Sequence, residues 1–395
     1  MLTRLPAAPW TARSDLAMLV DALGPDNLRW VGGAVRDTLL EQPVKDVDAA
    51  TPLLPDDVLA RLATAGIRAV PTGIAHGTVT AVLPDGPVEI TTLRRDVATD
   101  GRHATIAFAS EWRDDAARRD FTINALYADP RTLEISDWFD GLADLAQRRV
   151  RFIGDPVQRI REDHLRILRY YRFQARFGAE LDEAAEAACA ELAPTLKGLS
   201  RERVAMELLN LLALPDPAAT LARMDAAGVL PIALPERSAE GIALLHQLIG
   251  WEQAHAMVPD PLRRLAALLP ADPRPAEQAA ARLRLSTAQR KRLALAAGRQ
   301  ASDRDDPRAL AYRLGRAEAL DRLALTGGDP SPLAGWDVPA FPLKGGAIIA
   351  RGITAGPDVA RLLRTVEDRW IDRRFPGPDA TAALLDEVLA ADRRS

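Results

Sequence analysis

The 395-residue chain is longer than one average domain and is 48% apolar, so we expect two or more domains, each with its own core. It has no uninterrupted apolar run long enough to cross a bilayer and no secretory leader pattern at its start, so we expect a cytoplasmic protein with no membrane partner. Cys189 is the only cysteine, which excludes an internal disulfide and a zinc site built from cysteines. The net charge of −4 argues against a basic coat over the whole surface, but it allows a local basic track.

The first 140 or so residues are expected to form an α+β domain with a small sheet. Short β-rich runs occur at 28–31, 77–83, 88–93 and 105–108, and helical patterns occur at 14–23, 35–40 and 56–65. The Pro-Asp-Gly sequence at 84–86 lies between two β-rich runs and predicts a hairpin turn. After about residue 150 the β-rich runs stop, and apolar residues recur at helical spacing between proline-rich breaks.

A pair of glycines, Gly32 and Gly33, separates the first β-rich run from a helical pattern. Glycine lets the backbone approach a phosphate closely, and the start of a helix offers free N–H groups and a partial positive charge. Arg36, near the first turn of this helix, can donate hydrogen bonds to a phosphate. The spacing differs from that of a Walker P-loop and from Gly-x-Gly-x-x-Gly, so an ordinary turn is the alternative.

Three acidic residues are candidate metal ligands. Asp46 and Asp48 are two apart, so their side chains point to the same face if they lie on a strand. Two such carboxylates repel each other unless a cation lies between them, and Mg²⁺ prefers carboxylates together with substrate phosphates. Glu89 alternates with apolar neighbours, and the three carboxylates converge if its strand lies beside the Asp46/Asp48 strand. A solvated loop and a solvent-facing glutamate are the alternatives.

The sequence Arg-Arg-Asp-Phe-Thr-Ile-Asn-Ala at 118–125 combines cations with hydrogen-bonding groups. Arg119 can bind phosphate, whereas Asp120 and Asn124 can form hydrogen bonds with ribose hydroxyls. Their four-residue spacing places Asp120 and Asn124 on one face of a helix. The alternative is an aspartate that caps a helix, preceded by surface arginines.

Asp163 and Arg166 are three apart and would share one face of a helix. A carboxylate beside a guanidinium complements cytosine or adenine, because both bases present an amine donor next to a ring-nitrogen acceptor. Arg169 and Arg172 continue this ridge in three-residue steps, and the alternative is a salt bridge with solvated arginines. Nine arginines between 148 and 176, with few acids among them, predict a positively charged seam for a triphosphate or RNA.

In this order, the motifs resemble those of the class II tRNA nucleotidyltransferase and bacterial poly(A) polymerase family. The resemblance is firm over about 31–178, and the segments that carry it are 32–37, 46–48, 76–78 (His-Gly-Thr), the Glu89 strand, 118–125 and 162–166. Each motif alone is weak evidence, whereas their shared order is specific. Near the end, Lys344-Gly345-Gly346 and the segment 352–357 look like a stretch found in many members, whereas Glu41 stands where members often have glycine.

The resemblance implies a fold and a role for each candidate residue. A nucleotidyltransferase head of polymerase-β type at 1–148 would precede a helical neck at 149–235 and a helical, RNA-binding body and tail at 236–395. Mg²⁺ would bind Asp46 and Asp48, with Glu89 as the third catalytic acid. The nucleotide-binding residues would be Gly32, Gly33, Arg36 and Arg119 near the triphosphate, Asp120 and Asn124 near the ribose, and Asp163, Arg166, Arg169 and Arg172 near the base.

The implied reaction is template-independent addition of CCA to the 3′ end of tRNA from CTP and ATP, with release of pyrophosphate. Within the family, the alternatives are a poly(A) polymerase that uses ATP alone and an enzyme that adds only CC or only A. The chain lacks a clear basic-aromatic segment after the neck, which favours CCA addition. The segment 94–113 looks like the flexible loop of full CCA enzymes, which disfavours the CC-only form.

From another class, a catalytically silent RNA-binding scaffold is possible in principle. The three acids argue against it, because idle carboxylates that face one another are costly to keep. No histidine is followed by aspartate, so no phosphohydrolase domain is expected. The sequence leaves the oligomeric state and the RNA-contacting face of the helical half open.

Overall fold

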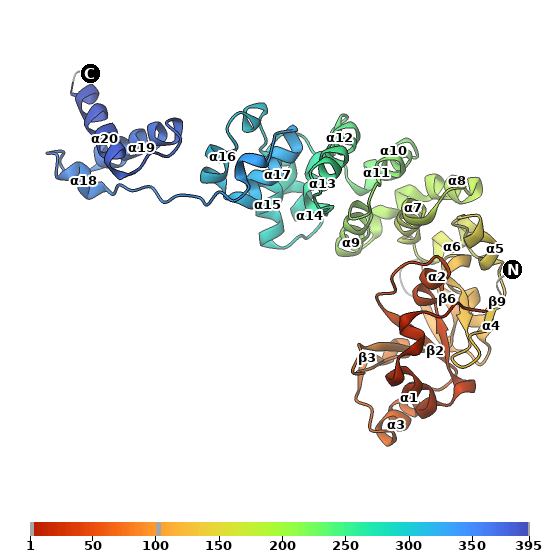
Figure 1. The fold of residues 1–395 in the computed structure, drawn as a ribbon. Helices are drawn as coiled ribbons and strands as arrows, with labels where there is room; N and C mark the ends of the chain where they lie inside the picture. Colours follow the sequence, from red (N-terminus) through yellow and green to blue (C-terminus); the bar gives the residue numbers. More distant parts are fainter. Residues whose placement is uncertain (1–3, 100–103, 394–395) are drawn as a thin grey trace. The chain divides into compact units, whose positions relative to one another are not determined.

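The computed structural model describes residues 4–99 and 104–393, which divide into two compact units, Met1–Pro235 and Glu236–Ser395. The first unit combines a sheet with helices, and the second is helical (Figure 1). This arrangement confirms the α+β fold class with a mostly helical remainder. None of the described helices is long and apolar enough to span a membrane.

The strands described in the first unit are β1 (Arg29–Val31), β2 (Val47–Thr51), β3 (Ala69–Gly73), β4 (Thr78–Ala81), β5 (Val88–Thr92), β6 (Arg94–Thr99), β7 (Ala104–Phe108), β8 (Leu126–Ala128) and β9 (Ile135–Asp137). Its α-helices are α1 (Ser14–Leu23), α2 (Gly33–Leu39), α3 (Pro55–Thr64), α4 (Trp112–Ala117), α5 (Gly141–Ala146), α6 (Pro156–Glu162), α7 (Arg166–Phe177), α8 (Glu183–Leu192), α9 (Arg201–Leu212), α10 (Ala218–Ala226) and α11 (Val229–Ala233). Its short 3₁₀ helices are η1 (Pro9–Ala12), η2 (Pro25–Asn27), η3 (Ile74–His76), η4 (Thr122–Asn124) and η5 (Ala193–Gly198).

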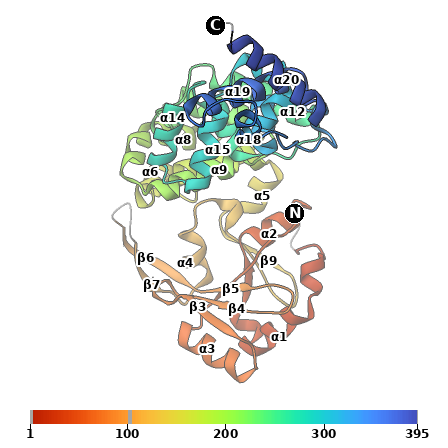
Figure 2. The same ribbon diagram turned by 90° about the vertical axis from the view of Figure 1, so that its left-hand side faces the viewer.

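Within the described residues, seven strands form one sheet in the order β3-β4-β5-β2-β1-β8-β9, and β6 pairs with β7 in a separate ribbon. The pair β2 and β5 is parallel, and the other neighbours in the large sheet are antiparallel. Figure 2 shows α3 beside the β3–β4 edge, which it contacts. Along β5, Val88 and Ile90 are buried and Glu89 is exposed, as the alternation predicts.

The predicted β-rich runs correspond to β1, β4, β5 and β7, and β4 and β5 form the predicted hairpin. Strands β3, β8 and β9 were not predicted, because two of them are three residues long and β3 contains a proline. The segment 94–113, interpreted as a loop, contains β6, β7 and the start of α4, while its Asp-Gly-Arg-His part at 100–103 lies outside the described residues.

The glycine pair joins β1 to α2, as predicted. Gly32 has a φ of +66°, a left-handed conformation that side-chain-bearing residues rarely adopt. The chain therefore reverses sharply at this point, and α2 packs against β1, β2 and β8.

Helix α7 carries an aromatic face that packs against Phe121, just before η4, and against Phe152, between η4 and α6. The rings of Phe121 and Phe152 are 4.9 Å apart, and those of Phe121 and Phe173 are 5.2 Å apart. Tyr170 stacks on Phe152 at 5.8 Å. Each such aromatic pair adds about 0.5–1.5 kcal/mol beyond the burial of its area, so this cluster fixes the backbone around residue 121 against α7.

The second unit consists of α12 (Gly241–Ala254), α13 (Pro261–Leu268), α14 (Pro273–Arg282), α15 (Thr287–Ala297), η6 (Ala301–Arg304), α16 (Pro307–Leu314), α17 (Arg316–Thr326), η7 (Ser331–Leu333), α18 (Gly345–Ile349), α19 (Pro357–Asp372) and α20 (Pro378–Asp392). Three of these helices begin with Asp-Pro, where the aspartate side chain accepts a backbone N–H and proline takes the first position; the capping residues are Asp260, Asp272 and Asp306. The apolar side of α19 packs on α20 through Leu362, Val366 and Trp370.

Candidate active site

A cavity of about 350 Å³ in the first unit collects seven of the thirteen predicted site residues: Asp48, Glu89, Arg119, Asp120, Asp163, Arg166 and Arg169. The remaining lining residues are Val31, Ala49, Thr91, Arg94 and Arg118. The other six predicted residues are absent from this lining, which consists of described residues; they are Gly32, Gly33, Arg36, Asp46, Asn124 and Arg172.

Two acids stand side by side on one wall of the cavity. The parallel register of β2 and β5 pairs Asp48 with Glu89, so the predicted neighbourhood of the two strands is correct. Burial raises the pKa of Asp48, the nearby charges of Glu89 and Asp46 raise it further, and Arg119 opposes them. Asp46 is exposed and precedes β2, so only one of the two aspartates lies on the strand.

Strand β5 lies beside β2, as the expected convergence of the three carboxylates requires, but Asp46 lies just before β2, so the convergence of all three stays a prediction. The described residues hold no group of three His, Cys, Asp or Glu side chains that could bind a metal ion. Asp48 and Glu89 still fit a magnesium ion, because this ion usually takes one or two carboxylates and completes its shell with water and substrate phosphates. Burial first, and then the like charges of Glu89 and Asp46, raise the pKa of Asp48, and a bound cation would favour its ionised form against both.

Arg119 lies between the acids and the glycine turn. A Cβ atom added at Gly32 would lie 3.3 Å from Nη1 of Arg119, so this glycine leaves space for the guanidinium. The Nε–H of Arg119 donates to the hydroxyl of Tyr127 at 2.8 Å, and its Nη2 is 3.3 Å from Asp115. The guanidinium is therefore fixed from behind, and its side chain is 19% exposed.

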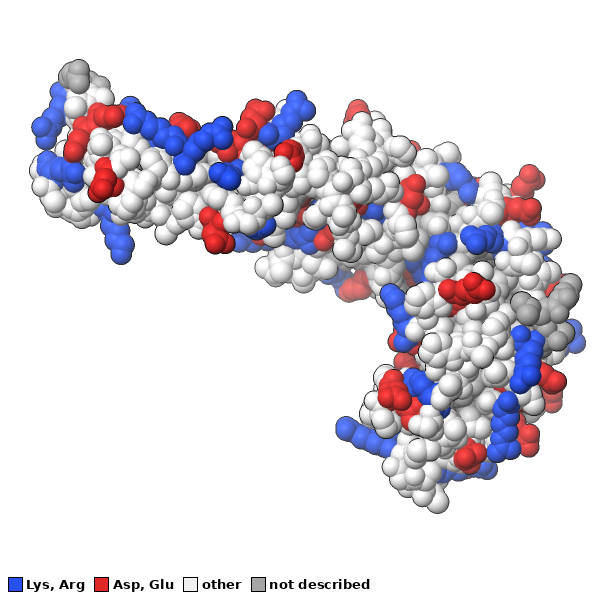
Figure 3. Space-filling model, in the orientation of Figure 1, with Lys and Arg blue, Asp and Glu red and all other residues white. Residues whose placement is uncertain are grey.

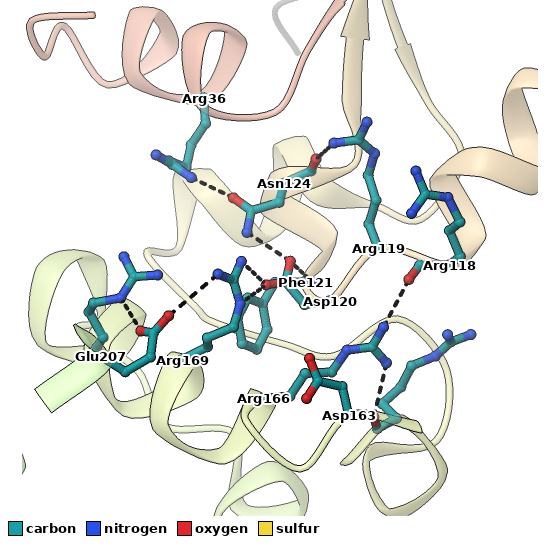
Figure 4. Close-up of polar contacts among 12 residues, drawn as sticks. Arg36, Arg118, Arg119, Asp120, Phe121, Asn124, Asp163, Arg166, Arg169 and Glu207 are labelled. Carbon is teal, nitrogen blue, oxygen red and sulfur yellow. Dashed lines mark hydrogen bonds and ion pairs between the residues drawn. The ribbon is translucent and has the colours of Figure 1, made fainter. Parts of the chain in front are cut away.

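Asp120 and Asn124 contact each other, although not on an α-helix. Only the short turn η4 forms in this segment, and the amide of Asn124 donates to Asp120 at 2.9 Å (Figure 4). Asn124 also accepts from Arg36, which is buried against the rings of Phe173 and Phe177. Arg36 thus holds α2 against α7 and does not line the cavity.

Asp120 forms an ion pair with Arg169 of α7, with the Nε of Arg169 at 2.8 Å (Figure 4). Burial alone would raise the pKa of Asp120, but Arg169 and the hydrogen bond from Asn124 outweigh it and lower the pKa to about 2. The carboxylate is therefore ionised at neutral pH. Arg169 is 3.7 Å from Glu207 on its other side, so α7 and α9 hold it in place.

The prediction that Asp163 and Arg166 share a helix face is wrong. Helix α6 ends at Glu162 and α7 begins at Arg166, and Asp163 is extended between them. The cause is local, because the Asp163 carboxylate accepts the backbone N–H of Leu165 at 3.1 Å and so competes with helix formation. Both side chains nevertheless line the same cavity.

The two residues have different partners there. The guanidinium of Arg166 donates to Glu162 at 2.7 Å. It also donates to the carbonyl oxygen of Arg118 at 3.0 Å (Figure 4). Asp163 pairs with Arg203 of α9 at 2.8 Å.

The predicted positively charged seam is largely neutralised by acids. The ion pairs are Arg149 and Arg151 with Asp144, Arg159 and Arg166 with Glu162, Arg169 and Arg172 with Glu207, and Arg176 with Asp37. Asp37 and Glu207 lie far from this segment in the sequence, so the spacing of the arginines could not reveal them. Over the face that Figure 3 shows, basic and acidic side chains are likewise interspersed.

Sequence reasoning missed four residues that organise the cavity wall. Asp115 and Tyr127 hold Arg119, whereas Arg203 and Glu207 pair with Asp163 and Arg169. One signal was available, because the four-residue spacing of Asp115 and Arg119 is typical of an acid–base pair on a helix. Tyr127, Arg203 and Glu207 gave no signal, because their partners are brought to them only by the fold.

Two family models match this chain. The model described as the Poly A polymerase head domain matches residues 28–151. The model described as the probable RNA and SrmB-binding site of polymerase A matches residues 178–240.

Two named relatives match this chain, one over most of its length and one over about half. The CCA tRNA nucleotidyltransferase 1, mitochondrial, of Danio rerio is 35% identical over 372 residues, which cover 88% of this chain and 84% of the relative. The CCA-adding enzyme of Enterococcus faecalis is 40% identical over 185 residues, which cover 46% of this chain and 44% of that enzyme.

Solved structures share the fold over nearly the whole chain. The Bacillus stearothermophilus CCA-adding enzyme in complex with CTP matches with a TM-score of 0.79 and 27% identity, covering 98% of this chain and 100% of that one. The Thermotoga maritima CCA-adding enzyme complexed with tRNA matches with a TM-score of 0.71 and 21% identity, covering 98% and 96% of the two chains, and this likeness concerns the fold alone. The chain belongs to the CCA tRNA nucleotidyltransferase family.

Proposed function

We propose that this protein adds CCA to the 3′ end of tRNA from CTP and ATP and releases pyrophosphate. The observation that carries the proposal is one cavity that holds acids for a metal, arginines for phosphates and polar groups suited to a base edge. The relative from Danio rerio, which is similar over 88% of this chain, is named for the same activity.

The reaction requires mainly that the protein position the tRNA end and the nucleotide for phosphoryl transfer. The 3′ oxygen of the tRNA forms a bond to the α-phosphorus of the nucleotide, and the bond from that phosphorus to the pyrophosphate oxygen breaks. Members of this family generally use a divalent metal, and we propose Mg²⁺, held by Asp48 and Glu89 and approached by Asp46. When bound, this ion would neutralise the negative charge that develops on the phosphate oxygens.

The chain's own groups bind and orient the nucleotide in this proposal. Arg119 faces the cavity next to Asp48, where a triphosphate bound to the metal would need a cation. Asp120 is an ionised acceptor for a ribose hydroxyl. Asp163 and Arg166, on the α6–α7 side of the cavity, are the proposed base-reading groups.

Four further predicted residues lie outside this lining: Gly33, Arg36, Asn124 and Arg172. Arg36 and Asn124 support Asp120, and Arg172 holds Glu207 with a 2.6 Å hydrogen bond. A cytoplasmic location stays a prediction, since relatives include proteins named mitochondrial.

A poly(A) polymerase is the second candidate, because the head model that matches carries that description. One assay separates the two activities. The purified protein is given Mg²⁺ and a tRNA that lacks its three terminal nucleotides, with labelled CTP, ATP or both, and product lengths are measured on a gel. Growth by two nucleotides with CTP, and by three with both, is expected.

The other outcomes of this assay are equally informative. A long ladder with ATP alone, on tRNA and on unrelated RNA, would replace CCA addition by poly(A) addition. Extension that stops after two nucleotides with both substrates would mean a CC-adding enzyme. No extension under any condition would overturn the proposal and favour an RNA-binding scaffold.

A further inference from the structure

The cavity-facing Arg119 rests on two buried residues that have no part in the proposed contacts with substrate. Asp115 is in α4 and Tyr127 is in β8, and both are at most 1% exposed. With Arg119 they form a closed triangle of polar contacts. Arg119 donates to the Tyr127 hydroxyl at 2.8 Å, that hydroxyl donates to Asp115 at 2.5 Å, and Asp115 is 3.3 Å from Nη2 of Arg119.

The triangle leaves one edge of the guanidinium for a ligand. Nε and Nη2 donate to Tyr127 and Asp115, and Nη1, at the glycine turn, donates a long hydrogen bond of 3.4 Å to the Asn124 carbonyl oxygen. Each terminal nitrogen carries two N–H groups, so one N–H of Nη1 and one of Nη2 are left for a ligand. The face of the guanidinium also lies 5.1 Å from the centre of the Tyr127 ring, a cation–π contact. These contacts restrict rotation of the long side chain, so its binding edge is oriented before a ligand arrives.

Protonation states suit this arrangement. Burial raises the pKa of Tyr127, and Asp115 raises it further, so the phenol keeps its proton and donates it. Burial alone would raise the pKa of Asp115, but Arg119 and Arg118 outweigh it and lower the pKa, so Asp115 stays a carboxylate acceptor.

Asp115 holds more than one element of the cavity wall. The same carboxylate pairs with Arg118 at 2.7 Å and accepts the backbone N–H of Arg94 at 3.1 Å. Arg94 is the first residue of β6, and Arg94, Arg118 and Arg119 all line the cavity. One buried acid thus pairs with two cations of the lining and holds the backbone of a third lining residue.

We propose that Asp115 and Tyr127 are positioning residues that hold Arg119 in the orientation that binds the triphosphate shared by CTP and ATP. This inference rests on the proposed function and deepens it. The triphosphate is common to all nucleotides, so the pair governs nucleotide affinity and turnover without taking part in base choice.

The test compares Tyr127→Phe with Tyr171→Phe. Tyr171 is a matched control because it is a fully buried tyrosine whose hydroxyl has no hydrogen-bond partner in the described part of the chain. Tyr127→Phe should raise the KM values for CTP and ATP by the same factor, about 3- to 10-fold for one lost hydrogen bond, and leave the preference over UTP and GTP unchanged. Tyr171→Phe should leave both KM values unchanged.

A double-mutant cycle then asks whether Tyr127 acts through Arg119. In an Arg119→Ala background, Tyr127→Phe should have no further effect on nucleotide KM, because the group that it positions is gone. Equal effects of Tyr127→Phe in the two backgrounds would overturn the positioning role, as would KM values for Tyr127→Phe that match those of Tyr171→Phe. A lowered melting temperature with unchanged KM values would mean a purely structural role.

A separate binding measurement distinguishes failure of this inference from failure of the proposed function. Binding of inorganic tripolyphosphate by calorimetry does not depend on nucleotide transfer. If the wild-type protein transfers no nucleotide, Tyr127→Phe and Asp115→Asn should still weaken tripolyphosphate binding relative to wild type and Tyr171→Phe. Equal tripolyphosphate binding by all four proteins would overturn this inference alone.

Discussion

Two arginine–carboxylate pairs on the α7–α9 side of the cavity use the same chemistry in different surroundings. In the Arg169–Asp120 pair the acid side chain is 10% exposed, whereas in the Arg203–Asp163 pair it is 30% exposed. Asp120 also accepts hydrogen bonds from Asn124 and from the backbone of Phe121. The first pair is therefore one part of a buried network, whereas Asp163 of the second has one ion pair and one backbone hydrogen bond, from Leu165, and lies within reach of water.

This difference suits the two parts of a nucleotide. Sugar and phosphates are the same in CTP and ATP, so their contacts can be fixed in advance by a buried network. The base differs between the two, so a site that accepts both needs groups that can change partners. Asp163, with one exposed ion pair, is less restrained than Asp120, which agrees with its proposed place at the base.

The largest effect is expected from the acids on the opposite wall. Asp48→Asn should lower nucleotide transfer by about 10³-fold or more, because charge stabilisation by a bound metal contributes several kcal/mol to the barrier. Asp57→Asn, at an exposed position of α3, is the matched control and should retain wild-type turnover. Single-turnover transfer of CMP to tRNA measures both. Turnover of Asp48→Asn within tenfold of wild type would remove Asp48 from the metal site.

Melting of Asp48→Asn with and without Mg²⁺ also tests whether this wall is a metal site. The folded-state pKa of Asp48 is raised, so stability is lost as the pH rises from the ordinary pKa towards the raised one, and the full cost is present above it. Without divalent metal at neutral pH, Asp48→Asn should therefore melt at a higher temperature than wild type. Mg²⁺ should raise the melting temperature of wild type more than that of the variant. A lower melting temperature of the metal-free variant would contradict the cost that burial and the like charges impose on the ionised Asp48.

The next effect concerns the buried pair. Arg169→Gln leaves the Asp120 carboxylate without its cation, which should cost about 1–3 kcal/mol, after allowance for the partial exposure of Arg169. Hydrogen exchange of the α7 amides gives this local free energy of opening without requiring the whole chain to unfold in one step. An unchanged opening free energy would mean that Asn124 alone satisfies Asp120.

Acid should reduce the difference in α7 opening free energy between Arg169→Gln and wild type. The pKa of Asp120 is lowered to about 2 in the folded chain, from an ordinary value of 3.8. A lowered pKa contributes stability that is present above the ordinary value and lost as the pH falls towards the folded one. The α7 opening energies of the two proteins should therefore approach each other between pH 4 and pH 2, and a constant difference would assign the effect to packing.

The contacts of the cavity wall differ in how far the sequence could predict them. The orientation of Asp48 and Glu89 could be predicted from the alternation of side chains along a strand, which is a local property. Their contact required in addition only that the two strands be neighbours. Asp120 and Asn124 were paired correctly for a partly wrong reason, since the segment forms a short turn held by aromatic packing. Glu207 and Arg203 lie on α9, and only the tertiary fold brings them to Arg169 and Asp163.

Helix ends were the least predictable feature of the site. The spacing of Asp163 and Arg166 suits one continuous helix, but an aspartate side chain can bind a backbone N–H and end it. The order of motifs predicted which residues gather, because it reflects a whole fold. Their individual contacts required the structure, since each depends on atoms far away in the chain.

A smaller effect, on selectivity, is expected at the exposed pair. Asp163→Ala should reduce the preference for CTP and ATP over UTP and GTP by about 10-fold, within the 1–3 kcal/mol that a base-edge contact contributes. The KM for CTP should change less than the preference does. Competition between CTP and UTP in one reaction measures the ratio, and an unchanged ratio would move base reading to other residues.

The smallest effect is expected for Arg203, the other half of that pair. Arg203→Ala removes an ion pair whose partners are 39% and 30% exposed, so local stability should change by only about 0.2–1 kcal/mol. Arg169→Gln and Arg203→Ala, measured by hydrogen exchange in the same buffer, compare the two pairs directly. The cost of Arg203→Ala should also shrink at high salt more than that of Arg169→Gln, because exposed charges are screened. Equal costs and equal salt dependence would mean that burial does not distinguish the two pairs, and the division between fixed contacts to the sugar and adaptable contacts to the base would fail with it.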